Sequence, residues 1–199
     1  VNGMAVVDAI AAVSTSSSTD KPYEDVVITS AKFAVVTDDL LSDTPEPGMV
    51  KKNSIELTDQ DFDYTEILNT NQVTESSVPT DYVCMEVADY GKVYLRLFPD
   101  TAPETVSNFK NLVSEGFYDG LTFHRVIKNS MIQGGDPEGT GLGGSDKTIK
   151  GEFLSNGVEN NLRHTRGVIS MARNLTDNDS ASSQFFICQK DFAKGDGNY

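Results

Sequence analysis

The sequence has no tryptophan, two cysteines and two histidines among its 199 residues. Cys84 and Cys188 lie far apart in apolar, strand-like runs, which favours two buried free thiols over a disulfide. His124 and His164 stand in no CxxC or HxxxH pattern, so the sequence indicates no metal site. A single histidine in a strand is more typical of a structural residue whose ring nitrogens are hydrogen-bonded than of a functional one.

Positive charge is also scarce, because 16 Lys and Arg face 30 Asp and Glu and give a formal net charge of −14. Such a field repels phosphate backbones and anionic lipid headgroups, so neither nucleic acid nor a membrane surface is an expected partner. No apolar run is long enough for membrane insertion, and the segment from Val1 to Val7 lacks the basic start of a signal peptide. The compartment stays open, with the cytoplasm slightly favoured over export or surface anchoring.

The composition changes twice along the chain. Residues 1–36 predict a short helix capped by Asn2, followed by a β-branched strand over 25–36. Residues 37–80 are acidic and polar and are interrupted by proline, which predicts a linker that packs little of the core. Short ordered patches in this linker are expected near Ile55 or over 62–67.

Residues 81–199 carry most of the regular pattern. A helix is expected from Pro103 to about Gly116, with Thr101 as its N-cap and Glu104 completing a capping box. Short strands are expected at 82–87, 92–98, 121–127, 131–133, 167–172 and 184–188. Many short strands with two helices favour a barrel or a sandwich.

Two motifs with known chemistry are incomplete. Gly139–Gly144 matches G-x-G-x-x-G, but residues 145–151 do not read as a helix start, so a flexible loop beside a binding groove is favoured over a nucleotide site. The sequence has no G-x-S-x-G elbow, and neither cysteine has an activating neighbour, so covalent catalysis and a hydrolase are disfavoured.

Arg125 is unusual because it interrupts the apolar strand predicted over 121–127. Strand alternation places Phe123, Arg125 and Ile127 on one face and the intervening residues on the other. The arginine is then either a salt-bridged residue at a rim or a cation held over an apolar pocket.

Four runs, at 123–127, 131–136, 167–172 and 183–188, together resemble the cyclophilins, which are peptidyl-prolyl cis-trans isomerases. The segments 170–173 and 180–184 resemble the bacterial branch. The resemblance implies a mainly β fold, an eight-stranded antiparallel barrel with two capping helices. It also implies catalysis without a cofactor, and proline-containing peptides or unfolded proteins as partners.

The order of the matching pieces is unusual. Residues 1–36 resemble the carboxyl-terminal part of a cyclophilin barrel and residues 81–199 its amino-terminal and central parts, with 37–80 between them. The chain ends where the family continues with a further strand, so the barrel is either circularly permuted or incomplete. Three alternatives stay open: a permutant, a window across two tandem cyclophilins, or a piece that exchanges a strand with another chain. The first two are favoured. Permutation is physically reasonable because domain termini tend to lie close together, whereas the missing strand would leave an unpaired sheet edge and counts against an autonomous barrel.

The resemblance also assigns roles. Arg125 is the catalytic residue, donating a hydrogen bond to the imide nitrogen as the peptide bond twists. Gln133 positions Arg125, and Tyr199 lies at the pocket rim. The remaining substrate-binding residues are Ile127, Met131 and Phe186 around the proline ring, and Ala172, Arg173 and Gln184 along the preceding residues.

Three positions depart from the family pattern. Ser130 stands where the family usually has a large apolar residue, and Lys194 and Gly195 replace a bulkier rim. These departures predict weaker substrate binding and weak affinity for cyclosporin-like cyclic peptides. The alternative function is a catalytically weak scaffold that binds proline peptides.

Overall fold

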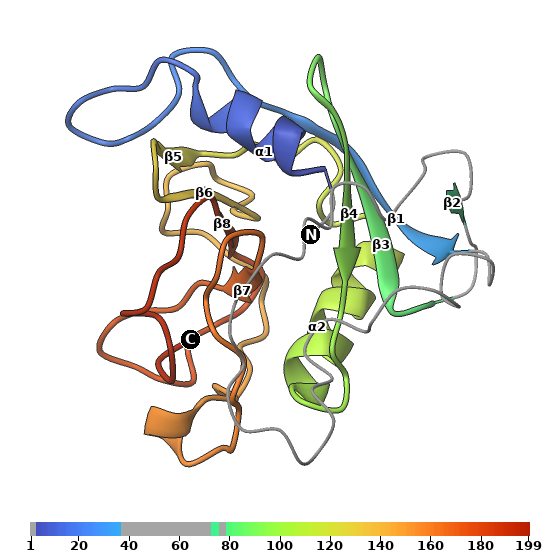
Figure 1. Cartoon of the computed structure of the whole chain (residues 1–199), viewed down its shortest axis with the longest axis vertical. Helices are drawn as coiled ribbons and strands as arrows, with labels where there is room; N and C mark the ends of the chain where they lie inside the picture. The colour runs from blue at the N-terminus through green and yellow to red at the C-terminus, as the bar shows by residue number, and fades with distance from the viewer. Residues whose placement is uncertain (1–2, 37–72, 76–78) are drawn as a thin grey trace.

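The computed structural model describes residues 3–36, 73–75 and 79–199 (Figure 1). The predicted Asn2 cap and the linker patches near Ile55 and 62–67 lie outside these ranges. The described elements are α1 (Met4–Ala11), β1 (Ile28–Val36), β2 (Val73–Glu75), β3 (Tyr82–Val87), β4 (Gly91–Arg96), α2 (Pro103–Ser114), β5 (Arg125–Ile127), β6 (Met131–Gly134), the 3-10 turn η3 (Leu154–Asn156), β7 (Ile169–Met171) and β8 (Phe185–Cys188).

The strands form two antiparallel four-stranded sheets, ordered β2-β1-β3-β4 and β5-β6-β8-β7. The mainly β prediction with two helices is confirmed, but the closed eight-stranded barrel is not what the described residues form. A barrel closes only when every edge strand finds a neighbour. Here an isolated bridge pairs Val27, which directly precedes β1, with Thr122, which precedes β5. Within the described ranges, β4 and β7 remain edge strands of their sheets.

The segment 1–36 is part of the same sheet as residues far along the chain. Strand β1 pairs with β3 from Ile28 opposite Val87 to Phe33 opposite Val83. The other edge of β1 pairs with β2, a three-residue strand that lies within the predicted linker 37–80. Figure 1 shows α1 lying above the gap between the two sheets, where it contacts β4, β5 and β6.

One hydrophobic core joins both helices and both sheets. Met4, Val7 and Ile10 of α1 pack into it together with residues of β3, β6 and β8. Gly3 is the N-cap of α1 and has a positive φ of 92°. A side chain could not be placed there, because a Cβ on Gly3 would lie 2.6 Å from the carbonyl oxygen of Lys92.

Helix α2 is capped from a distance. Its N-cap is Ala102, whose methyl group cannot accept a hydrogen bond, so the predicted capping by Thr101 and Glu104 is wrong. The carboxylate of Glu152 instead accepts the backbone N–H groups of Glu104 (3.1 Å) and Thr105 (2.8 Å). The apolar face is as predicted, with Val106, Phe109, Leu112 and Val113 buried.

We expect Glu152→Ala to lower the free energy of unfolding by about 0.5–2 kcal/mol, the usual cost of losing a helix cap. The carboxylate satisfies two free N–H groups and also lies at the positive end of the helix dipole. Urea denaturation measures the change. Glu159→Ala, at an exposed glutamate of the same region, is the matched control; equal stability of the two variants would contradict the capping role.

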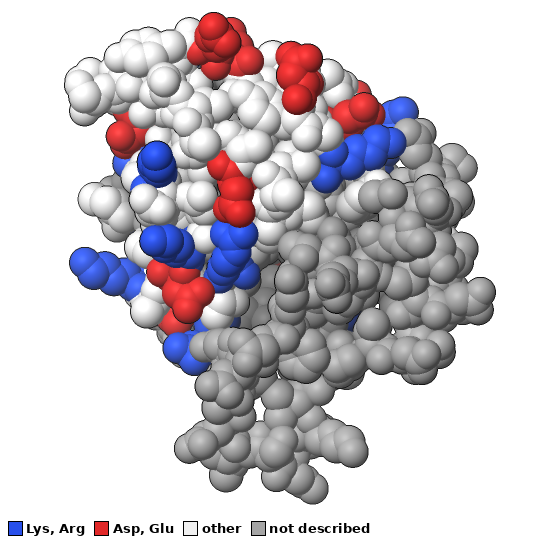
Figure 2. Space-filling model, turned by 45° about the horizontal axis from the view of Figure 1, so that its top comes forward, with Lys and Arg blue, Asp and Glu red and all other residues white. Residues whose placement is uncertain are grey.

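Both cysteines are buried thiols outside any disulfide, as predicted. Burial raises the pKa of the Cys188 thiol to about 12, which makes it a packing residue rather than a nucleophile. In the part of the chain that the structure describes, no helix has the length and apolarity needed to cross a bilayer. Figure 2 shows acidic and basic side chains interspersed on the described surface of that view.

Candidate active site

Strand register brings several predicted site residues into one row. Arg125 lies opposite Gln133, Gln133 opposite Phe186, and Phe186 opposite Ser170. Two residues along β5, Ile127 lies opposite Met131. Because side chains on a strand alternate, these residues share one face of the β5-β6-β8-β7 sheet. The opposite face carries core residues, which are Val126, Ile132, Phe185 and Ile187.

Strand β5 is shorter than predicted and begins at Arg125. Phe123 precedes it, is fully buried and packs edge-on against Phe185 in the core, with ring centroids 6.0 Å apart. The prediction that Phe123 and Arg125 share a face is therefore wrong. Period-two alternation does not apply to the residues that lead into the strand.

Arg125 is half-exposed and is held by one acidic residue of the N-terminal segment. Its Nε atom lies 3.4 Å from Oδ2 of Asp20, and the Asp20 carbonyl accepts the N–H of Val126 at 2.8 Å. Asp20 has a positive φ of 57°, which aspartate tolerates better than most residues. Asp20 therefore contacts both the strand that bears Arg125 and the guanidinium itself.

A cavity of about 400 Å³ opens beside the guanidinium. The residues that line it are polar or glycine, whereas the sequence suggests a hollow lined by large apolar side chains. The lining residues are Thr19, Lys21, His124, Arg125, Gln133, Gly139, Thr140 and Gly141. The apolar members Ile127 and Met131 lie on the same sheet face, two residues along their strands from Arg125 and Gln133. Arg125 is thus paired with a carboxylate, as the first interpretation of the sequence has it, and it lies beside a cavity that the large apolar residues of the site do not line.

Gln133 and Gln184 form a linked pair of amides. Gln133 Nε2 donates to Gln184 Oε1 at 2.8 Å, and Gln184 Nε2 donates to the carbonyls of Gly141 (3.1 Å) and Gly143 (2.7 Å). The Gln184 carbonyl accepts the N–H of Ala172 at 2.8 Å. These bonds fix the glycine stretch against β8 and place Ala172 next to the row that carries Arg125.

The glycine stretch 139–144 is folded around Asp136 rather than around a nucleotide. The Asp136 carboxylate accepts the backbone N–H groups of Glu138 (2.8 Å), Thr140 (3.0 Å) and Gly141. Burial alone would raise the pKa of Asp136, but these N–H groups hold it below its ordinary value. The loop is therefore organised by an ionised carboxylate at the edge of the cavity.

His124 does not fit the expectation of a hydrogen-bonded structural histidine. It is 5% exposed, and neither ring nitrogen finds a hydrogen-bond partner among the described residues. Burial is the largest influence on this imidazole and lowers its pKa, so the ring is neutral at pH 7. His124 borders the cavity from the buried side.

The other end of the row carries an aromatic cluster, formed by His164, Phe186, Phe192 and Tyr199. Phe186 is 4% exposed and meets Tyr199 edge-on, with centroids 5.6 Å apart. Phe192 lies against both rings, at 6.3 and 6.4 Å. The Arg173 guanidinium lies over the Tyr199 ring, 4.9 Å from its centroid, and its Nε donates to the Asn198 carbonyl at 2.9 Å. These two contacts hold Asn198 and Tyr199 against the cluster.

The model of the family described as "Cyclophilin type peptidyl-prolyl cis-trans isomerase/CLD" matches residues 82–199. The chain belongs to this family. The resemblance inferred for residues 81–199 is confirmed, including its assignment to the isomerases, whereas the permuted order of the pieces stays a prediction.

Curated relatives agree with the family model. A Bacillus subtilis protein named peptidyl-prolyl cis-trans isomerase B is 49% identical over 108 residues, which are 54% of this chain and 70% of the relative. A Helicobacter pylori peptidyl-prolyl cis-trans isomerase is 47% identical over 55% of this chain and 64% of its own length. A Streptococcus pyogenes protein, named for a phosphatase and a peptidyl-prolyl isomerase, is 50% identical, and the chain spans 21% of its length.

Solved structures show the same fold. A Cryptosporidium parvum cyclophilin, crystallised in the presence of the dipeptide Ala-Pro, is 34% identical with a TM-score of 0.51 over 56% of this chain and 70% of its own. A Hirschia baltica cyclophilin is 27% identical with a TM-score of 0.52 over 61% and 62% of the two chains.

Of the three positions that depart from the cyclophilin pattern, Ser130 and Gly195 have the following surroundings. Ser130 lies in the turn between β5 and β6, and its carbonyl accepts the N–H of Gln189 at 2.8 Å. At Gly195 a Cβ would lie 2.8 Å from the Phe192 ring and 3.0 Å from His164. A side chain at position 195 would press against the aromatic cluster, which favours glycine there.

Sequence reasoning did not find Asp20, His164, Phe192 or Asp196 as members of the site. Asp20 is 105 positions before Arg125, and its contact depends on how 1–36 packs on β5. His164 has a partner 32 positions away, Asp196, and no local motif links the two.

We expect the cyclophilin to lose stability as the pH is lowered from about 7.5 to about 5.5. Burial lowers the pKa of both His124 and His164 in the native state, whereas an unfolded histidine takes a proton near pH 6.5. The unfolded state therefore binds more protons in this window, and the free energy of unfolding falls with decreasing pH. Urea midpoints measured across the window test this. His124→Phe should flatten the slope, and a parent protein with no slope would contradict the assignment.

Proposed function

We propose that this chain catalyses rotation about X–Pro peptide bonds, without a covalent intermediate, and so assists protein folding. The observation that carries the proposal is the cross-strand row of the family-matched segment. It places the Arg125 guanidinium at a cavity and on the same sheet face as Met131 and Phe186. The relatives' names and the Ala-Pro dipeptide of the Cryptosporidium structure support the same chemistry.

The reaction needs positioning rather than a nucleophile. Rotation about a peptide bond has a barrier of about 18–20 kcal/mol, while the two isomers of an X–Pro bond differ by only about 0.5–1 kcal/mol. Twisting the bond breaks amide resonance and leaves a lone pair on the imide nitrogen. A fixed guanidinium can donate a hydrogen bond to that lone pair without giving up its proton. Arg125 takes this role because Asp20 restrains its Nε atom and leaves the side chain half-exposed.

The proline ring is assigned to the apolar part of the same face. Ile127, Met131 and Phe186 contact the ring, with Tyr199 at the rim against Phe186. Gln133 is assigned to the substrate backbone and to the placement of Arg125, which it faces across β5 and β6. Ala172, Arg173 and Gln184 are assigned to the residues before proline, supported by the bond between Ala172 and the Gln184 carbonyl.

The domain organisation follows from the same contacts. Residues 1–36 and 81–199 are proposed to fold as one cyclophilin-like unit, connected through 37–80. Pairing of β1 with β3 and the packing of Met4, Val7 and Ile10 into the shared core support this. The Asp20–Arg125 pair supports a direct contribution of 1–36 to catalysis.

The test is an isomerisation assay on the full chain with a short Ala-Pro peptide. Uncatalysed isomerisation takes tens to hundreds of seconds at 25 °C, so acceleration is easily resolved by exchange NMR or by a coupled protease. Acceleration that saturates with peptide concentration is expected. Binding without any acceleration would instead support a scaffold that binds proline peptides. Cyclosporin-like cyclic peptides are expected to inhibit only weakly, because Ser130 and Gly195 offer less apolar surface.

A further inference from the structure

His164 is the buried ring on which the rest of the aromatic cluster rests. It is 5% exposed and lies almost parallel to Phe186, with centroids 5.9 Å apart and an interplanar angle of 17°. Tyr199 meets it edge-on at 6.3 Å, and Phe192 at 6.2 Å. Moving the imidazole would therefore move the support of both Phe186, at the floor of the proposed proline site, and Tyr199, at its rim.

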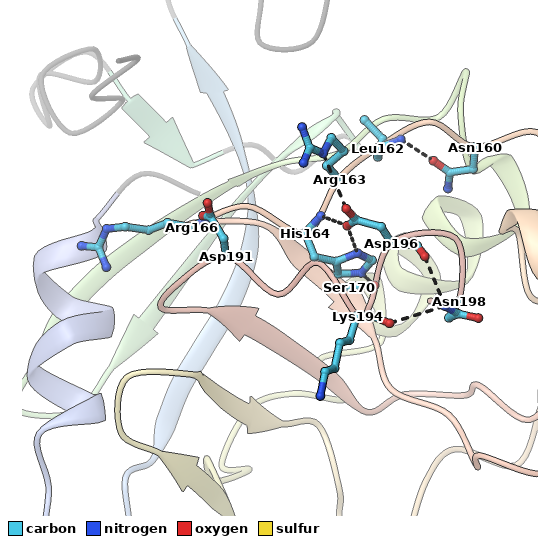
Figure 3. A network of polar contacts seen from close by, with 10 residues as sticks. All are labelled: Asn160, Leu162, Arg163, His164, Arg166, Ser170, Asp191, Lys194, Asp196 and Asn198. Atoms are coloured by element: carbon cyan, nitrogen blue, oxygen red, sulfur yellow. Dashed lines mark hydrogen bonds and ion pairs between the residues drawn. The ribbon is translucent and has the colours of Figure 1, made fainter. Parts of the chain in front are cut away.

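Polar contacts at both ring nitrogens fix the orientation of His164 (Figure 3). Nδ1 lies 3.2 Å from Oδ1 of Asp196, and Nε2 lies 3.1 Å from Oγ of Ser170. The same Asp196 oxygen accepts the backbone N–H of His164 at 2.6 Å. Because a carboxylate only accepts, Nδ1 carries the proton, and Nε2 then accepts from the Ser170 hydroxyl. The ring can neither rotate nor flip without losing a hydrogen bond.

The charges around the ring maintain this state. Burial is the largest influence on His164 and lowers its pKa, so the imidazole is neutral at pH 7. The Asp196 carboxylate also pairs with Arg163, whose Nε lies 3.5 Å from its second oxygen. Hydrogen bonds from His164 and Arg163 outweigh burial and keep the pKa of Asp196 below its ordinary value.

Ser170 links His164 to the cross-strand row of residues that includes Arg125. It lies opposite Phe186 in the pairing of β7 with β8, and Phe186 lies opposite Gln133. The hydroxyl that holds His164 thus belongs to the same row of residues as Arg125. A Ser–His–Asp order also occurs in hydrolases, but here the imidazole is enclosed by three aromatic rings, which favours support of those rings over proton transfer to a substrate.

We propose that His164, held between Asp196 and Ser170, is a positioning residue that sets the rings of Phe186 and Tyr199 for binding of the proline ring. This inference rests on the proposed function, because the floor and rim of the proline site are assigned there. Rings fixed before binding lose less conformational entropy when a substrate arrives, so the network contributes to affinity. A pocket that holds proline equally in the ground and transition states affects KM and leaves kcat unchanged.

Two Asp196 variants isolate the hydrogen bonds. Asp196→Ala removes the acceptor from both N–H groups of His164. Asp196→Asn keeps one acceptor oxygen for them but loses the charge and replaces the oxygen that pairs with Arg163 by an NH2 donor. With an Ala-Pro peptide, Asp196→Ala is expected to raise KM and the Kd by about tenfold, with kcat changed less than about twofold. Asp196→Asn is expected to restore values within about threefold of the parent. His164→Phe, which keeps a ring but loses both polar contacts, should behave like Asp196→Ala.

The matched control is Asp119→Ala. Asp119 is an exposed aspartate whose carboxylate also accepts a backbone N–H, that of Ala31 at 2.8 Å, in another part of the fold. It should leave KM and Kd unchanged. If Asp196→Ala and His164→Phe lower the urea midpoint but leave KM and Kd at parent values per folded molecule, the positioning role is wrong.

Aromatic NMR of the free protein gives a readout independent of catalysis. In Asp196→Ala the Phe186 and Tyr199 ring signals are expected to shift and broaden, and in Asp196→Asn to return toward the parent. Unchanged ring signals in Asp196→Ala would overturn the inference. A parent chain that binds peptide without accelerating isomerisation would overturn the proposed activity alone, since Kd and ring signals would still decide the role of His164.

Discussion

Arg125→Ala is expected to lower kcat for isomerisation of an Ala-Pro peptide by about 100-fold or more, the usual effect of removing one preorganised donor from a transition state. The guanidinium meets the imide nitrogen only when the bond is twisted, so the loss falls on kcat, while the Kd for peptide changes little. Single-turnover exchange NMR together with a peptide titration separates the two quantities. An Arg125→Ala variant that keeps the parent rate would remove the central step of the proposed mechanism.

Arg125→Lys is the matched control for charge. Lysine keeps the positive charge near Asp20 but lacks the planar fork and its directed N–H groups, so kcat should stay close to that of the alanine variant. Both substitutions should leave the urea midpoint nearly unchanged, because the Arg125–Asp20 pair is largely solvated and such pairs contribute about 0–1 kcal/mol. A large drop in stability would instead identify Arg125 as a structural residue.

Phe185→Ala is expected to lower the free energy of unfolding by about 3–5 kcal/mol, the cost of removing a buried phenylalanine. Phe185 is fully buried on the core face of β8. It meets Phe109, Tyr118 and Phe123 edge-on, with ring centroids 5.5 to 6.0 Å apart. Urea denaturation followed by far-ultraviolet circular dichroism measures the loss.

Phe185→Leu is the control for cavity volume. Leucine restores most of the apolar contact, so this variant should recover more than half of the lost stability. Peptide affinity per folded molecule should stay at the parent value in both variants, because Phe185 faces away from the row of Arg125. A Phe185→Ala protein as stable as the parent would show that the core at β8 is not formed as described.

Features that depend on a short window of sequence were predictable, and those that depend on distant contacts were not. The strand over Tyr82–Val87, the apolar face of α2 and the buried thiols of both cysteines were predictable, because each depends on a period or on residue type within a short window. The capping of α2 was not predictable, because the group that accepts its N–H bonds, the Glu152 carboxylate, lies 48 positions after Glu104. A local capping rule sees only the residues next to the helix.

The candidate site shows the same division. The motifs around Arg125, Gln133, Phe186 and Gln184 carry the family resemblance, so these residues were predictable as a set. Their register as one row was not, because it depends on how β5, β6 and β8 pair. The hydrogen-bonding state of His124 was predicted wrongly, since a buried ring finds or misses its partners according to packing that no sequence pattern records.

The sequence by itself determined the family, the mainly β class and the guanidinium that bears the proposed chemistry, because these depend on residue identity and order. The tertiary structure decided which distant groups support that chemistry. Asp20 meets Arg125, and Asp196 meets His164, only because the chain brings segments 105 and 32 positions apart into contact. Hydrogen bonds and ring contacts act over a few ångströms in space, whatever the separation along the chain.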